Sequence, residues 1–159
     1  MEHDELIQHV AAGLLRRGER LGTAESCTGG LIAAACTDLA GSSQWFERGI
    51  VSYSNEAKTE LLGVPAALIA QHGAVSAEVA EHMALGLLGR APVDWTLAVT
   101  GIAGPSGGSA AKPVGTVWLA LASRGRPTQV WREQFAGDRQ AVRAQTVRSA
   151  LEALERALI

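Results

Sequence analysis

The run Trp95–Thr100 (WTLAVT) restricts the fold of this chain more than any other stretch. All of its residues are apolar or threonine, without alternation between polar and apolar positions. Such a run is typical of a strand that is covered on both faces by helices. It leads directly into the glycine-rich stretch Gly101–Gly108, and loops that leave buried strands commonly carry function.

Helical and strand patterns alternate around this run. The predicted helices cover residues 4–17, 30–39, 55–62, a short segment from Pro65, 76–88 and 139 to the end. The predicted strands cover residues 21–24, 46–53, 95–100, 115–122 and 129–135. Ser54 and Ser76 are expected to cap helices, and a tight turn makes the last two strands an antiparallel hairpin. The order predicts an α/β fold, a three-layer α/β/α single domain over residues 1–159 with a mixed sheet of about five strands.

Length and charge exclude several classes of protein. A chain of 159 residues fits one domain. Its formal net charge of −2 provides no basic surface for nucleic acid or for an anionic membrane. The longest apolar runs are too short to span a bilayer. We therefore expect a cytoplasmic protein without a nucleic-acid or membrane partner, and a homo-oligomer remains compatible with the sequence.

Cysteine and histidine usage predicts neither disulfides nor a metal. The two cysteines, Cys27 and Cys36, are close in sequence, so reduced thiols are the better interpretation. The four histidines show no metal-ligand spacing. We therefore expect no metal and no cofactor.

The segment Thr23–Gly30 (TAESCTGG) places Ser26 and Thr28 at a turn between a strand and a helix. Free amides at the helix start, with Gly29 and Gly30 allowing close approach, would form an oxyanion or phosphate site. Alternatively, Ser26 or Thr28 caps the helix and the glycines only shape the turn. The residues alone leave both interpretations open.

A serine nucleophile needs a base, and none of the histidines is convincingly placed. Lys58 is expected in the first turn of a helix capped near Ser54, where the helix dipole and partial burial would favour a neutral amine. Tyr53, at the end of the preceding strand, could orient that amine or relay a proton. An exposed helix lysine and a strand-end core tyrosine are the competing interpretations.

Two further groups could bind an anion. The stretch Thr100–Val117 clusters glycines before Lys112 but contains neither a Walker motif nor GxGxxG. Arg139 and Arg143, four residues apart at a helix start, lie on one face and could hold a phosphate. A flexible loop and a solvated helix face are the alternatives.

The motifs AESCTGG, GSSQWFERGIVSYSNEAK, HGAVS, TGIAGPSGGS and KPVGTVW occur in this order, and with them the chain resembles the CinA C-terminal domain family over nearly its whole length. The resemblance implies hydrolysis of the carboxamide of nicotinamide mononucleotide (NMN), which yields nicotinate mononucleotide and ammonia in pyridine nucleotide salvage. It also implies that Ser26 is the nucleophile, supported by Lys58 and Tyr53.

The resulting hypothesis is an amidohydrolase in which Ser26, Lys58 and Tyr53 are catalytic. The residues expected to bind substrate or the oxyanion are Thr28, Gly29, Gly30, Thr100, Gly101, Ala103, Gly104, Arg139 and Arg143. The alternatives are a non-catalytic nucleotide-binding module and an amidase for another small substrate.

Overall fold

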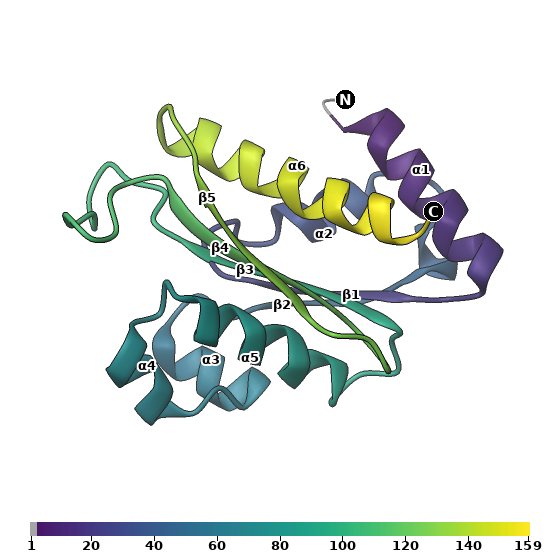
Figure 1. The fold of residues 1–159 in the computed structure, drawn as a ribbon. Coiled ribbons are helices and arrows are strands. Elements are labelled where there is room, and N and C mark those ends of the chain that lie inside the picture. Colours follow the sequence, from purple (N-terminus) through teal and green to yellow (C-terminus); the bar gives the residue numbers. More distant parts are fainter. Residues whose placement is uncertain (1–2) are drawn as a thin grey trace.

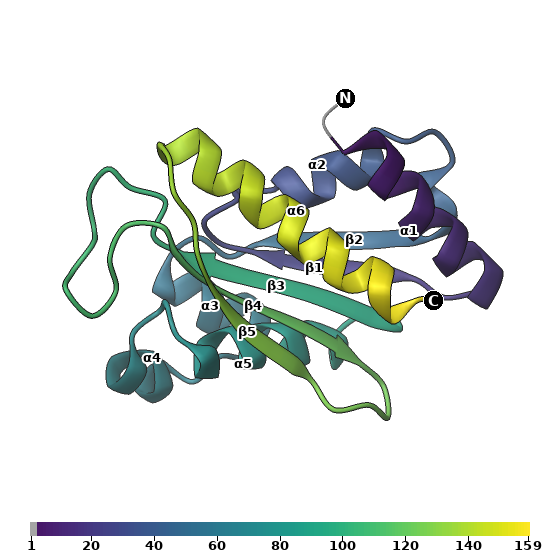
Figure 2. The ribbon, with the colours of Figure 1, turned by 45° about the horizontal axis from the view of Figure 1, so that its top comes forward.

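The computed structural model describes residues 3–159 and shows a twisted five-stranded sheet between two layers of helices (Figures 1 and 2). The strands are β1 (Leu21–Glu25), β2 (Phe46–Val51), β3 (Trp95–Gly101), β4 (Thr116–Ser123) and β5 (Gln129–Gln134). The helices are α1 (Asp4–Arg17), α2 (Leu31–Thr37), α3 (Asn55–Leu62), α4 (Ala66–His72), α5 (Ala77–Leu88) and α6 (Arg139–Ala157), with a short 3₁₀ helix at Ser42–Gln44. None of the described helices is both long and apolar enough to cross a membrane.

The sheet is mixed, with the order β2-β1-β3-β4-β5. β1 pairs in parallel with both β2 and β3, whereas β4 is antiparallel to β3 and to β5. The predicted three-layer α/β/α architecture, the mixed sheet and the final hairpin are therefore confirmed. Because β1, β2 and β3 run the same way, their carboxyl ends lie at one edge of the sheet.

Each face of the sheet has its own apolar core. Helices α1, α2 and α6 cover one face, and α3, α4 and α5 cover the other (Figure 1). In β3, Leu97 and Val99 pack into the first core, while Ala98 packs into the second. This double coverage explains why the run Trp95–Thr100 is apolar without alternation.

The predicted serine caps are confirmed. The Ser54 hydroxyl accepts a hydrogen bond from the amide of Ala57 at the start of α3, and the Ser76 hydroxyl accepts one from Val79 at the start of α5. Such caps satisfy amides that have no partner within the helix. Both helices lie in the layer that carries Lys58.

Some predicted boundaries were wrong by one or two residues. The helix predicted over 30–39 is Leu31–Thr37, because Gly30 has a φ of 104°, outside the helical region. The strand predicted over 46–53 ends at Val51, because the carbonyls of Ser52 and Tyr53 accept hydrogen bonds from the Lys58 amine. The end of β2 is thus already part of a polar site.

α3 is held in place by a close contact with α5. A Cβ atom built at Gly86 in α5 would lie 1.9 Å from the carbonyl oxygen of Leu62 in α3. Only glycine allows the two backbones to approach this closely. The contact sets the position of α3 and hence of Lys58.

The substitution Gly86→Ala should lower the free energy of unfolding by about 1–3 kcal/mol, because the added methyl forces the two helices apart. This loss should outweigh the gain of about 1 kcal/mol in helix propensity. Gly89→Ala is the matched control, since its Cβ would come no closer than 3.5 Å to another residue. Urea denaturation checks both, and a Gly86→Ala variant as stable as the wild type would contradict the expectation.

Candidate active site

Three chain segments meet at the carboxyl edge of the parallel strands. Ser26 directly follows β1, Tyr53 comes two residues after β2, and Thr100 and Gly101 end β3. After β1 the chain enters α2 on one face of the sheet, and after β2 it enters α3 on the other (Figure 2). In α/β sheets, ligands bind at such a point, where successive connections diverge to opposite faces.

Ser26 and Lys58 form the central pair of this edge. The Ser26 Oγ lies 3.0 Å from the Lys58 Nζ. Nζ also lies 3.1 Å from the carbonyl oxygen of Ser52 and 3.0 Å from that of Tyr53. The prediction that the serine and lysine come together is therefore confirmed by their geometry, and the interpretation of Lys58 as an exposed helix lysine was wrong.

Burial determines the chemistry of this lysine. Only 1 % of Lys58 is exposed, and this burial lowers its pKa below the ordinary value, because loss of water disfavours the ammonium form. A neutral amine has two N–H groups and one lone pair. The N–H groups can donate to the carbonyls of Ser52 and Tyr53, which leaves the lone pair for the Ser26 hydroxyl proton. The contacts thus match a general base.

Tyr53 contacts the Ser26–Lys58 pair through its backbone carbonyl, whereas its phenol contacts Arg139. Its carbonyl oxygen accepts from Lys58 and lies 3.4 Å from the Ser26 Oγ. Its side chain is 61 % exposed, and its hydroxyl accepts a hydrogen bond of 3.4 Å from Arg139. The interpretation as a strand-end core residue was therefore wrong, and the amine is oriented by a carbonyl that any residue at this position would supply.

The turn after β1 settles the question of capping. Neither Ser26 nor Thr28 caps α2, whose N-cap is Gly30 without a side-chain cap bond. The amides of Ile32 and Ala33 donate instead to the buried carboxylate of Glu25. Sequence reasoning missed this role of Glu25, although the residue stands directly before the candidate nucleophile.

Only some of the amides expected to form an anion site at the helix start are without a backbone partner. The amide of Gly29 donates to the carbonyl of Ser26, and that of Leu31 donates to the carbonyl of Thr28. Within residues 3–159, the amides of Cys27, Thr28 and Gly30 donate to no backbone carbonyl, and that of Cys27 hydrogen-bonds to its own thiol. Of these three residues, only Cys27 lines the cavity beside Ser26.

A cavity of about 210 Å³ opens at Ser26 and Lys58. Its lining includes the predicted residues Tyr53, Thr100, Gly101, Ala103 and Arg139. It also includes Cys27, Asn55, Ala74 and Val75, which were not predicted to contact substrate. Asn55 lies within the YSNEAK motif, and Ala74 and Val75 lie within the HGAVS motif, but the position of these motifs along the chain did not show that they would meet at this edge.

Four predicted substrate-binding residues other than Arg143 do not line this cavity: Thr28, Gly29, Gly30 and Gly104. Thr28 is fully buried, and its hydroxyl donates to Glu25. Gly29 and Gly30 have φ values of 56° and 104°, a backbone region that favours glycine. These residues shape the site without facing its cavity.

The two arginines of α6 have different partners, although they are four residues apart. Arg139 is exposed at the cavity and donates to the carbonyl of Gly104 at 2.8 Å. Arg143 does not line the cavity; it donates to the carbonyls of Cys27 and Thr28, at 3.1 and 3.2 Å. Both arginines already donate to groups of the chain, and of the two only Arg139 lines this cavity, so a phosphate site shared by both stays a prediction.

The thiol next to Ser26 is a poor nucleophile. Both cysteines are free, as predicted, and both are buried. Burial raises the pKa of Cys27 to about 12, so the thiol stays protonated at neutral pH. Within the described residues, no three His, Cys, Asp or Glu side chains gather as metal ligands.

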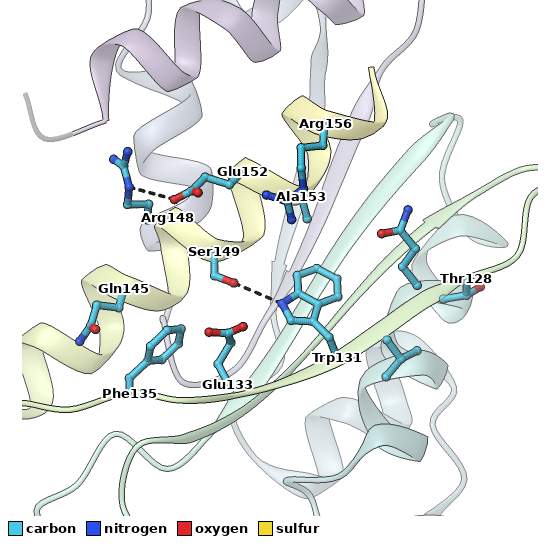
Figure 3. Close-up of a pocket in the computed structure, with 12 residues that line it drawn as sticks. Thr128, Trp131, Glu133, Phe135, Gln145, Arg148, Ser149, Glu152, Ala153 and Arg156 are labelled. Atoms are coloured by element: carbon cyan, nitrogen blue, oxygen red, sulfur yellow. Dashed lines mark hydrogen bonds and ion pairs between the residues drawn. The ribbon is translucent and has the colours of Figure 1, made fainter. Parts of the chain in front are cut away.

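A larger hollow of about 840 Å³ lies between β5 and α6, away from this edge (Figure 3). Four of its side chains are paired with one another. Arg148 forms an ion pair of 2.9 Å with Glu152, and the indole of Trp131 donates to the Ser149 hydroxyl at 3.2 Å. The Ser149 hydroxyl thus contacts an indole N–H, whereas that of Ser26 contacts an amine.

A model of the CinA C-terminal domain matches residues 3–158. The chain belongs to this family. It is 53 % identical over 150 residues to the nicotinamide-nucleotide amidohydrolase PncC of Shigella flexneri, covering 94 % of this chain and 91 % of that protein. The corresponding PncC of Escherichia coli K12 is 52 % identical with the same coverage.

Solved structures of the family share the fold. The competence/damage-inducible protein CihA of Agrobacterium tumefaciens superposes with a TM-score of 0.96 at 45 % identity, covering 99 % of this chain and 96 % of that one. A CinA superfamily protein of Escherichia coli gives a TM-score of 0.91 at 37 % identity, with 97 % and 88 % covered. A CinA-like protein of Geobacter sulfurreducens is 55 % identical, but the chain spans only 38 % of its length.

Proposed function

We propose that this protein hydrolyses the carboxamide of NMN to nicotinate mononucleotide and ammonia. The observation that carries the proposal is the buried Ser26–Lys58 pair, with 3.0 Å between Oγ and Nζ. A serine beside a desolvated amine is an activated nucleophile. Full-length relatives named nicotinamide-nucleotide amidohydrolase support the choice of substrate.

In the first step, the Ser26 Oγ attacks the carboxamide carbon while the neutral Lys58 amine accepts the hydroxyl proton. The carbonyls of Ser52 and Tyr53 hold the amine in line during this transfer. The resulting ammonium then donates a proton to the departing nitrogen, and ammonia leaves. Water, activated by the same amine, hydrolyses the acyl-enzyme ester and regenerates Ser26.

The oxyanion of the tetrahedral intermediate binds the amide of Cys27 in this mechanism. That amide follows the nucleophile, Cys27 lines the cavity, and no backbone carbonyl within residues 3–159 accepts its proton. A preorganised donor aimed at developing charge commonly contributes about 3 kcal/mol to catalysis. The amide of Gly29 is excluded from this role by its bond to Ser26.

The size of the cavity suggests how the nucleotide lies. At about 210 Å³, the cavity is smaller than the sites of roughly 300–1,000 Å³ that enclose whole drug-sized ligands. In our proposal the pyridine ring enters the cavity and the phosphate stays at the mouth. Arg139, exposed at that mouth, is the proposed phosphate contact.

Purified protein should release ammonia from NMN, and Ser26→Ala should abolish the release while the fold and most NMN binding persist. Ser43→Ala, an exposed serine at the opposite end of β2, is the control. Ammonia is measured by a coupled assay and binding by calorimetry. Activity above about a tenth of wild type in Ser26→Ala would refute the nucleophile. If the wild type binds NMN without turnover, the result would favour a nucleotide-binding module. If it hydrolyses another amide instead, the result would favour an amidase for a different substrate.

The kcat/KM for NMN should increase with pH, and this rising limb of the pH profile should report the deprotonation of Lys58. The free amine is the active form, its fraction rises with pH, and burial places the midpoint below the ordinary lysine pKa of about 10.4. Lys58→Arg should be nearly as damaging as Lys58→Ala, because a guanidinium does not deprotonate usefully. Tyr53→Phe keeps the carbonyl and should keep the limb. Loss of the limb in Tyr53→Phe, together with its survival in Lys58→Arg, would identify the phenol as the base.

Arg139→Ala should raise the KM for NMN about tenfold, as expected for loss of one charge-assisted hydrogen bond of about 1.4 kcal/mol. The kcat/KM for nicotinamide riboside, which lacks the phosphate, should change little. Arg132→Ala, an exposed arginine on β5, is the control. An unchanged KM for NMN in Arg139→Ala would exclude this arginine as the phosphate contact.

A further inference from the structure

Glu25 is a buried carboxylate that the proposed mechanism does not use. It ends β1 directly before Ser26, and only 1 % of it is exposed. It does not line the cavity, so it does not contact a substrate there. A buried carboxylate is unfavourable unless hydrogen bonds compensate for its lost water, which directs attention to its partners.

All of its side-chain partners belong to the segment that follows Ser26. Oε1 accepts hydrogen bonds from the Thr28 hydroxyl and, at 2.9 Å, from the amide of Ile32. Oε2 accepts from the amide of Ala33 at 3.0 Å. The carboxylate thus links the turn that follows Ser26 to the first residues of α2.

The backbone of Glu25 is also hydrogen-bonded to Ser52, which contacts the Lys58 amine. Its carbonyl oxygen accepts from the amide of Ser52 at 2.8 Å, and the carbonyl of Ser52 in turn accepts from the Lys58 Nζ at 3.1 Å. The side chain of Glu25 therefore holds the turn that follows Ser26. Its main-chain carbonyl holds Ser52, whose own carbonyl contacts Lys58.

We propose that Glu25 is a positioning residue for Ser26: its carboxylate, through Thr28 and the start of α2, holds the nucleophile at its 3.0 Å separation from the Lys58 amine. This inference rests on the proposed function for its kinetic readout. Misplacement of a reacting group by about 1 Å can reduce a rate by around a hundredfold. The carboxylate should therefore affect kcat and leave KM for NMN unchanged.

Glu25→Gln removes the carboxylate with little change in shape. One oxygen becomes an NH₂ group, which cannot accept a hydrogen bond from the donor that faces it. We expect kcat for NMN to fall by about 10- to 100-fold, with KM changed less than about twofold. Thr28→Val and Thr28→Ser form the matched pair: valine removes the hydroxyl donor and should lower kcat, whereas serine keeps the donor and should restore it. Thermal unfolding gives the folded fraction, to which kcat is normalised.

A purely structural role would give a lower melting temperature with unchanged kcat per folded enzyme in Glu25→Gln, and this result would overturn the proposal. Equal kcat in Thr28→Val and Thr28→Ser would overturn the part assigned to Thr28.

A second readout separates this inference from the proposed function. A fluorophosphonate probe reacts with Ser26 by forming a P–O bond and expelling fluoride, while Lys58 takes the hydroxyl proton, and intact mass spectrometry follows the rate. Slower labelling of Glu25→Gln supports the positioning role even if the wild type releases no ammonia from NMN. Labelling at the wild-type rate would refute it.

Discussion

Parallel pairing of β1 with both β2 and β3 is the constraint on which the site depends. Parallel strands require crossover connections, and here the connection through α2 covers one face while that through α3, α4 and α5 covers the other. Ser26 therefore leaves the sheet toward one helical layer, and Lys58 comes from the opposite layer. They meet only because both layers begin at the same edge.

Burial of an amine at this meeting point links stability to chemistry. An isolated ammonium in an apolar interior is strongly disfavoured. The fold compensates with two carbonyls from the end of β2, and burial moves the lysine toward its neutral form. The same desolvation that makes Lys58 unusual as a core residue supplies the unprotonated amine proposed for catalysis.

The start of α6 organises the site from the other side. Arg143 donates to the two carbonyls that follow Ser26, while Arg139 bridges the glycine-rich loop and the Tyr53 phenol at the cavity. Residues four apart on a helix share a face. They are also one helical turn apart along the axis, so Arg139 lies at the cavity while Arg143 lies at the turn that follows Ser26. A helix from the end of the chain thus completes a site built on its first three strands.

Local patterns in the sequence were sufficient for the α/β architecture and the serine caps, and they made Ser26 and Lys58 candidates, which the family resemblance then favoured. Apolar periodicity and capping chemistry act over a few residues, so they can be read directly. Only the tertiary structure decided that the Tyr53 carbonyl contacts Lys58, that Arg139 and Arg143 have different partners, and that Glu25 occupies the amides at the start of α2. These outcomes depend on which buried donor meets which acceptor across segments far apart in the chain, and spacing along the sequence does not encode that pairing.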